Sequence, residues 1–119
     1  MENTTPKIFE SEYRFCLILW EKEPISRSEL AAVCKEKLGW SRTTTYTVIS
    51  RLAARGVLTA EAGAVRSLVS KEEVQRAEMG DLLEKRFEGS LPAFIAAFTK
   101  VGKISERDAE EIKRMLEQQ

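Results

Sequence analysis

The chain has 119 residues and a mass of 13.5 kDa, enough for one ordinary domain or for a small binding module with a short oligomerisation arm, but too little for two enzymes. Nineteen basic and nineteen acidic side chains leave a formal charge of zero, which by itself argues against a nucleic-acid-binding protein. No apolar run approaches the roughly 18 residues of a membrane span, and the opening residues lack the apolar core of a signal peptide. We therefore expect a cytoplasmic protein without membrane insertion.

The charge is unevenly distributed along the chain. Residues 1–68 contain ten bases and eight acids, a net charge of +2, whereas residues 69–119 contain nine bases and eleven acids, a net charge of −2. Within residues 37–66 there are five bases and one acid, a net charge of +4. An acidic C-terminal part therefore masks a basic segment. Its bases are Lys37, Arg42, Arg51, Arg55 and Arg66, and its acid is Glu61.

The first half of the chain begins with two short helical patterns. One spans Glu10 to Lys22 and stops before Pro24. Its expected buried positions are Tyr13, Cys16, Leu17 and Trp20. The next begins at a capping box formed by Ser26 and Glu29 and runs to Lys37, before Gly39 breaks it. Its expected buried positions are Leu30, Ala31, Val33 and Cys34.

A third helix, within Trp40 to Leu58, is the most informative segment. Ser41 is placed to cap it, and Gly56 is placed to end it. One face carries groups that reach bases and phosphates, namely Arg42, Thr43, Thr44, Tyr46, Thr47 and Arg51. The opposite face is apolar, with Val48, Ile49 and Leu52 at buried-helix spacing. The pattern predicts a helix whose apolar face packs on the protein core and whose polar face enters a DNA groove.

Two strand-like runs, residues 57–59 and 64–69, follow this helix and enclose the turn Glu61–Gly63. The order predicts a winged helix-turn-helix, a mainly α fold with a small β-wing, over residues 1–69. The alternative is a plain three-helix bundle whose third helix is merely solvated. We favour the winged helix because residues 37–60 contain no acid, whereas a solvated face usually mixes acids with bases.

Residues 70–119 show three further helices with narrow apolar stripes. Ser70 and Glu73 open the first, Gly89 and Ser90 interrupt it, and Ser105 caps the last. About fifty residues of this kind do not easily enclose a core, so we expect a partner copy to cover them. The alternative is that they fold back on the N-terminal domain. The expected dimerisation residues are Leu83, Phe87, Phe94, Ile95, Phe98, Ile112, Met115 and Leu116.

Catalysis and metal binding find little support. The chain has no histidine, no glycine-rich phosphate loop, and no serine or cysteine beside a plausible base. Cys16 and Cys34 are too few and too far apart for a zinc site or a disulfide framework, and we interpret them as core residues. We expect no enzyme, no metal and no cofactor.

The order and spacing of several motifs resemble the penicillinase-repressor family of winged-helix transcriptional repressors. The resemblance covers nearly the whole chain. The segments that carry it are Glu10–Tyr13 with Leu19–Trp20, Ser28–Leu30, Trp40–Leu58, Leu68–Glu73, Gly89–Leu91, and Ile104–Glu106 leading to Leu116.

The resemblance implies a homodimer that sits on an inverted-repeat operator in double-stranded DNA, with the third helix in the major groove. The reading residues carry over to Arg42, Thr43, Thr44, Tyr46, Thr47 and Arg51. We expect Arg55, Arg66 and Ser28 to contact phosphates. The wing is about three residues shorter than is common in the family and contains no aromatic residue. The alternative function is a winged-helix protein-interaction module without DNA binding, which would expose more aromatic anchors than Tyr46 alone.

Family members that respond to antibiotics are cut by a membrane sensor protease at an Asn-Phe bond. The matching pair here is Ala97–Phe98, in which the phenylalanine is kept and the asparagine is not. The resemblance therefore implies a possible cleavage site and a protease partner, while dimer packing explains Phe98 equally well. The copper-responsive branch uses a C-terminal cysteine cluster, and this chain has no cysteine after Cys34.

Overall fold

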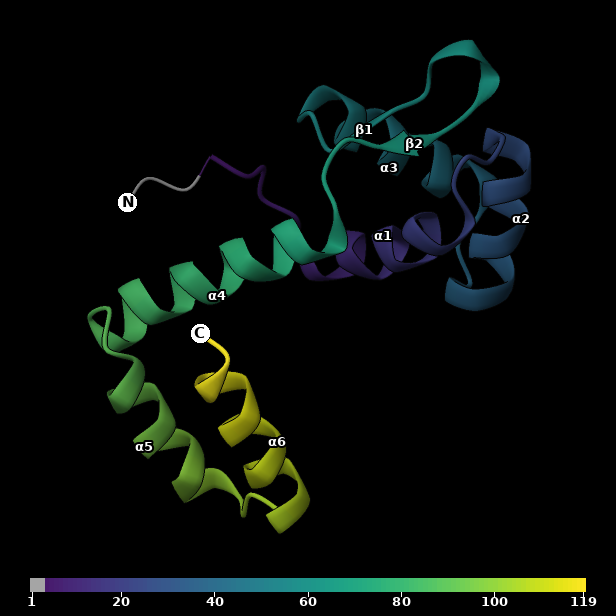
Figure 1. Ribbon diagram of the computed structural model, residues 1–119. Helices are drawn as coiled ribbons and strands as arrows, with labels where there is room; N and C mark the ends of the chain where they lie inside the picture. Colours follow the sequence, from purple (N-terminus) through teal and green to yellow (C-terminus); the bar gives the residue numbers. More distant parts are fainter. Residues whose placement is uncertain (1–3) are drawn as a thin grey trace. The chain divides into compact units, whose positions relative to one another are not determined.

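The computed structural model describes residues 4–119, which form two compact units, one ending at Glu78 and the other spanning Met79–Gln119 (Figure 1). The division falls within one continuous helix, α4 (Lys71–Phe87). The fold is mainly helical with one small antiparallel sheet, as expected from the sequence. The assignment of residues 1–69 and 70–119 as functional domains stays a prediction, because α4 contributes to both units.

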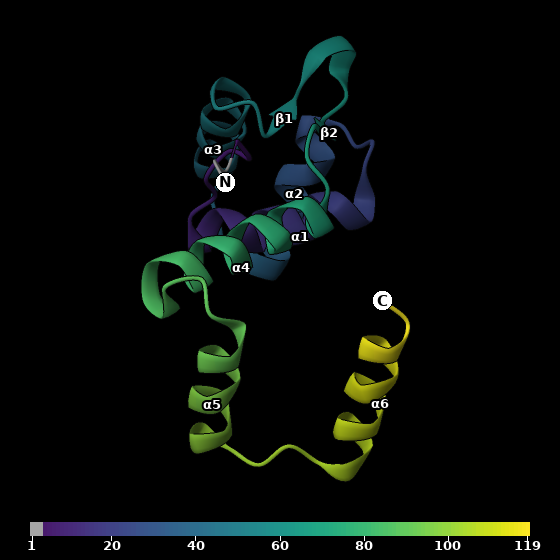
Figure 2. The ribbon, with the colours of Figure 1, turned by 60° about the vertical axis from the view of Figure 1, so that its left-hand side comes forward.

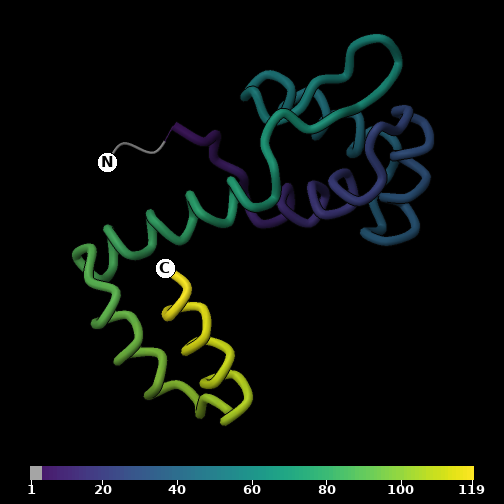
Figure 3. Tube along the Cα trace, viewed as in Figure 1, coloured from purple at the N-terminus to yellow at the C-terminus, as the bar shows by residue number. Residues whose placement is uncertain are grey.

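The N-terminal unit contains three helices, a hairpin and the start of α4, in the expected order (Figure 3). Helix α2 packs against α3, α1 contacts α2 and β2, and α3 contacts β1. The bounds are α1 (Glu10–Lys22), α2 (Arg27–Leu38), α3 (Arg42–Ala54), β1 (Leu58–Thr59), the 3-10 turn η1 (Glu61–Gly63) and β2 (Arg66–Ser67).

Capping side chains set the starts of these helices. The Ser26 hydroxyl accepts a hydrogen bond from the Glu29 amide at 3.2 Å, and Ser41 accepts one from the Thr44 amide at 3.1 Å. Each bond satisfies a backbone N–H that has no partner within the first helical turn. After α3 the chain turns at Gly56, whose φ of +82° is one that other residues rarely adopt. The predicted limits of α2 and α3 are therefore confirmed to within about one residue.

The buried face of α1 differs from the predicted one. The structure buries Phe15, Ile18 and Leu19 together with Cys16, whereas Leu17 is 37% exposed. Tyr13 and Trp20 lie half-buried at the edge of the core. The prediction was right for Cys16 and wrong for Leu17. The run from Phe15 to Trp20 is apolar almost all round, so helical periodicity alone admits two neighbouring stripes. Packing against α2 and β2 selects one of them.

The wing is shorter than the sequence suggested, with two residues in each strand. Leu58 pairs with Ser67 and Thr59 with Arg66. The segment before α2 adds a further bridge, in which the Val65 amide donates to the Ile25 carbonyl at 2.7 Å. This pairing encloses Val65 completely, so the base of the wing is part of the core.

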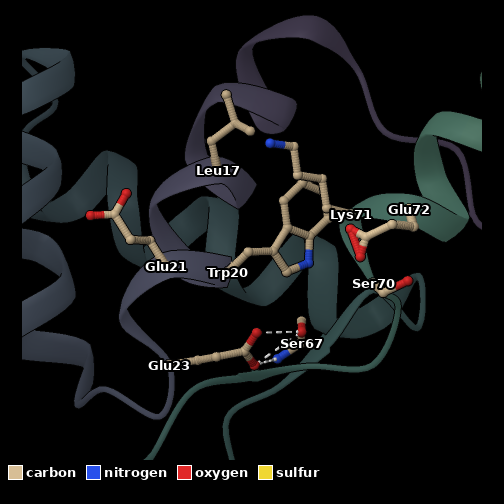
Figure 4. A pocket seen from close by; sticks show the side chains of 8 residues that line it. All are labelled: Leu17, Trp20, Glu21, Glu23, Ser67, Ser70, Lys71 and Glu72. Atoms are coloured by element: carbon tan, nitrogen blue, oxygen red, sulfur yellow. Dashed lines mark hydrogen bonds between the residues drawn. The ribbon is translucent and has the colours of Figure 1, made fainter. Parts of the chain in front are cut away.

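Two side chains of the α1 end hold the wing and the start of α4 (Figure 4). The Trp20 indole N–H donates to the Val69 carbonyl at 2.9 Å, and the Glu23 carboxylate accepts from the Ser67 amide at 2.7 Å. Val74 of α4 is buried in the same core. The first turns of α4 are therefore packed on the winged helix.

The C-terminal unit holds the rest of α4, α5 (Leu91–Val101) and α6 (Glu106–Glu117). Helices α5 and α6 are joined by an extended segment (Figure 2). Ser105 caps α6 as predicted, accepting from the Asp108 amide. Ser90, predicted only to interrupt the preceding helix, also caps α5 by accepting from the Ala93 amide. Within the described chain neither helix has a buried residue. The apolar positions predicted for this unit therefore form no core within a single chain.

None of the helices in residues 4–119 is both long and apolar enough to cross a membrane.

Candidate nucleic-acid interface

Helix α3 has two chemically distinct faces. Val48, Ile49 and Leu52 are buried in the core, as predicted, and so is Thr45. The buried stripe holds the helix against α2 and β1. The first turn of α3 contains no acidic residue, unlike the first turns of α1, α2, α4 and α6. The partial positive charge of this helix N-terminus is therefore not neutralised by its own side chains.

The residues predicted to read DNA come together on the outer face of α3. Tyr46 is half-buried and packs against the edge of the core. Ser50 is also exposed and was missed by the sequence analysis, although it follows Tyr46 and Thr47 at helical spacing, which could have identified it. The exposed predicted residues are Arg42, Thr43, Thr44, Thr47 and Arg51.

Arg42 and Tyr46 contact each other along this face. The Arg42 Nε donates a hydrogen bond to the Tyr46 hydroxyl at 3.1 Å. The Arg42 guanidinium carbon lies 5.5 Å from the centre of the Tyr46 ring, within the range of a cation–π interaction. The first and fifth residues of α3 are therefore coupled through their side chains.

Two of the predicted phosphate-contacting residues lie on exposed elements outside α3. Arg66 is exposed on β2, opposite Thr59 of β1. Ser28 is exposed in the first turn of α2, with its hydroxyl 3.4 Å from that of Ser26. Both side chains are available to a ligand.

Arg55, the third predicted phosphate contact, is engaged within the protein. Its guanidinium forms an ion pair with Glu12 of α1 at 2.5 Å. It also lies over the Phe9 ring, 5.3 Å from the ring centre. The sequence gives no sign of this pairing, because the two residues are distant in the chain and no local pattern connects them. Much of the Arg55 charge is offset by this carboxylate.

The Glu12 carboxylate is buried in the described structure, yet it stays ionised. Burial by itself raises the pKa of Glu12. The hydrogen bonds from Arg55 and from the Phe9 amide, together with the charges of Arg55 and Arg51, outweigh that effect and hold the pKa below its ordinary value. The ion pair is therefore present at neutral pH.

A separate open pocket of about 670 Å³ lies where α1, β2 and α4 meet (Figure 4). Its carboxylate Glu23 is already bound by the Ser67 amide and hydroxyl. None of the predicted DNA-contacting residues lines it. The lining residues are Leu17, Trp20, Glu21, Glu23, Ser67, Ser70, Lys71 and Glu72.

Both thiols lie inside the N-terminal core. Cys16 and Cys34 are buried and unpaired, as the core interpretation predicted. Burial raises the pKa of Cys16 to about 12 and also raises that of Cys34, so both stay as thiols at neutral pH. Within residues 4–119 no three side chains of the His, Cys, Asp and Glu types are grouped to hold a metal ion.

Comparison with known proteins decides the family. The family model described as "Penicillinase repressor" matches residues 8–118, nearly the whole chain and both units. The chain belongs to the penicillinase-repressor family. Its members are regulatory repressors rather than enzymes, and the chain accordingly has the role of a transcriptional repressor.

Three relatives extend this similarity, each named methicillin resistance regulatory protein MecI. The protein of Staphylococcus aureus strain Mu50 is 23% identical over 120 residues, with 98% of each chain covered. Those of Mammaliicoccus sciuri and Staphylococcus epidermidis are 22% identical over the same length and coverage. This repressor is therefore similar to them from end to end, though at low identity.

Proposed function

We propose that this penicillinase-repressor family member acts as a homodimer that binds an inverted-repeat operator, with α3 of each copy in the DNA major groove. The observation that carries the proposal is the outer face of α3, where hydroxyl and guanidinium groups are exposed on a helix with a buried back. These groups match the donors and acceptors at base edges. A helix-turn-helix unit uses such a face to read DNA.

The charge distribution also supports placing the outer face of α3 against DNA. Arg42, Arg51 and Arg66 are exposed, and residues 37–60 contain no acid. The start of α3 adds the positive end of a helix dipole, which favours nearby phosphates. Because Arg55 is paired with Glu12, we assign it mainly to holding α3 in place, with a phosphate contact as a secondary role.

The C-terminal unit supplies the dimer contact in this proposal. In a single copy its apolar side chains remain largely in solvent; Phe98, for example, is 51% exposed and Met115 is 59% exposed. Phe98 and Met115 also line an open groove of about 380 Å³ between α5 and α6. A second copy would remove this apolar surface from water, which is the main driving force for such association. The other strongly exposed apolar residues of α5 and α6 are Leu91, Ile95, Val101, Ile112 and Leu116.

Dimerisation would also explain the form of the operator. Two copies related by a two-fold axis present two identical recognition helices, about one DNA turn or roughly 34–36 Å apart. Each helix then reads one of two identical half-sites, which run in opposite directions along the DNA. A palindromic sequence with that spacing is the expected target.

The test is to incubate the full chain with fragmented genomic DNA from its source at near-physiological salt and to sequence the retained fragments. A few enriched promoters that share an inverted repeat would support the proposal. The matched control is Arg51→Ala, which removes one exposed group of α3 and should lose the enrichment. Uniform weak retention by both proteins would contradict operator binding and favour the protein-interaction module.

Proteolytic derepression is a further part of the proposal. The Ala97–Phe98 bond lies inside α5, and the Phe98 ring is 6.3 Å from that of Phe94. Cutting there would split α5 and separate its aromatic side chains, which would weaken the proposed dimer. A membrane sensor protease would be the partner. If the repressor stays intact in cells exposed to the signal that lifts repression, this part of the proposal is wrong.

A further inference from the structure

We infer that Arg42 reads a guanine in each operator half-site and that Tyr46 is the residue that positions it. This inference rests on the proposed function, and it assigns one base and two distinct roles within the α3 face. It depends on the contact between the Arg42 Nε and the Tyr46 hydroxyl, 3.1 Å apart.

Tyr46 is suited to hold another side chain in place. Its ring is half-buried and packs against the edge of the core formed by residues such as Ile49. The hydroxyl therefore extends from an anchored ring to the exposed surface of α3. Arg42 occupies the first position of the helix, one turn before Tyr46, so the pair has the i, i+4 spacing at which side chains meet on a helix.

The hydrogen bond to Tyr46 leaves the two Nη atoms of the Arg42 guanidinium free to bind a base. Arginine has five N–H donors, and the bond to Tyr46 uses the one on Nε. The four donors on the two Nη atoms remain, at the end of the side chain. Guanine presents two acceptors, O6 and N7, to the major groove, and a planar pair of N–H groups can bind both at once. Adenine offers a donor in place of O6 and cannot accept the same pair.

The position of Arg42 and the residues around it agree with the reading of a guanine. The N-terminal residues of a recognition helix are the ones that contact base edges in helix-turn-helix proteins. Arg42 is at that end, and within residues 4–119 it forms no ion pair that would divert its charge. Its neighbours Thr43 and Thr44 are exposed hydroxyl residues without charge. Restraint by Tyr46 reduces the rotamer freedom that Arg42 would otherwise lose on binding.

The experiment selects DNA from random duplexes long enough for two half-sites, using the full chain and four variants. Arg42→Lys keeps the charge but loses the planar fork, and Tyr46→Phe keeps the ring but loses the hydroxyl. Two matched controls make the same chemical changes on α1, at exposed Arg14 and at Tyr13, whose hydroxyl lies 3.5 Å from Gln75 Nε2. They are Arg14→Lys and Tyr13→Phe. Thermal unfolding of each variant checks that the fold is kept.

The expected wild-type motif has one dominant guanine in each half-site. Arg42→Lys should abolish that preference, and Tyr46→Phe should reduce it by up to about tenfold while other positions keep theirs. Both α1 controls should select the wild-type motif. An unchanged guanine preference in Tyr46→Phe would overturn the positioning role, and an unchanged one in Arg42→Lys would overturn the reading role. A wild-type protein that selects no motif would instead overturn the proposed function itself.

Discussion

Glu12 of α1 and Arg55, at the end of α3, form an ion pair of 2.5 Å that joins the first helix of the fold to the helix proposed to read DNA. The Glu12 side chain is 9% exposed, so the carboxylate has little access to water. Its oxygen Oε1 also accepts the Phe9 amide at 2.9 Å, which links the start of α1 to the same pair. The orientation of α3 therefore depends on a carboxylate outside it.

Replacing Glu12 with alanine should destabilise the protein by about 1–3 kcal/mol, because the Arg55 guanidinium and the Phe9 amide lose a charged acceptor. Urea unfolding of the full chain at fixed concentration measures this. The control is Glu10→Ala, at an exposed position in the same helical turn. Equal losses from the two changes would show that the ion pair contributes nothing.

The same pair should make stability depend on acid. The pKa of Glu12 is below its ordinary value of 4.5 in the folded protein, so the carboxylate stabilises the fold above that value. That contribution should be lost as the pH falls through the lowered folded pKa. Unfolding of wild type and Glu12→Gln over pH 3–7, a range of about four units around the ordinary pKa, provides the measurement. The difference between them should shrink toward the acid end, and a constant difference would contradict this account.

Arg51 and Arg66 should differ in what they contribute to binding. Arg51→Ala should lower affinity for the operator by about tenfold or more with little effect on random DNA, because it removes a group that we propose contacts bases. Arg66→Ala should weaken both DNAs alike and reduce the slope of log affinity against log salt by about 0.9, since it removes one proposed phosphate contact. Titrations of each variant with operator and random DNA at several salt concentrations distinguish the two roles. Identical behaviour of the two variants would contradict the assigned roles.

If the proposed dimer forms through α5, Phe98→Asp should convert it into monomers and so abolish operator binding. A charge in a buried interface is costly unless it is paired, and Phe98 is the more exposed of the two aromatic side chains of α5. Sedimentation at several concentrations measures the mass, and circular dichroism checks the helix content. Thr99→Asp places the same charge at the next residue and should remain dimeric. A dimeric Phe98→Asp protein would show that the interface lies elsewhere.

The thiols should be unreactive in the folded state. Burial raises the pKa of Cys16 to about 12, and Cys34 is completely enclosed. A thiol reagent at neutral pH should therefore label neither residue until urea unfolds the chain, after which both should react. Rapid labelling of native protein would mean that the N-terminal core opens readily.

The sequence alone determined most of the secondary structure. Helix starts were predictable because Ser26, Ser41, Ser90 and Ser105 each bind an amide three residues further on, an interaction that local sequence reveals. The two faces of α3 were predictable for a similar reason. Its buried apolar residues Val48, Ile49 and Leu52 are few and lie at spacings of three and four residues to Leu52, so only one orientation buries them.

Tertiary structure decided what local spacing left open. It selected which stripe of the apolar α1 is buried, because only packing against α2 and β2 distinguishes two neighbouring stripes. It also paired Arg55 with Glu12 and Trp20 with the Val69 carbonyl, contacts between residues far apart in the chain. The sequence by itself thus identified the polar face of α3, whereas the folded chain alone showed that Arg55 is held by Glu12 and that Arg42 meets Tyr46. Such pairings arise only when distant or flexible side chains are brought to fixed positions.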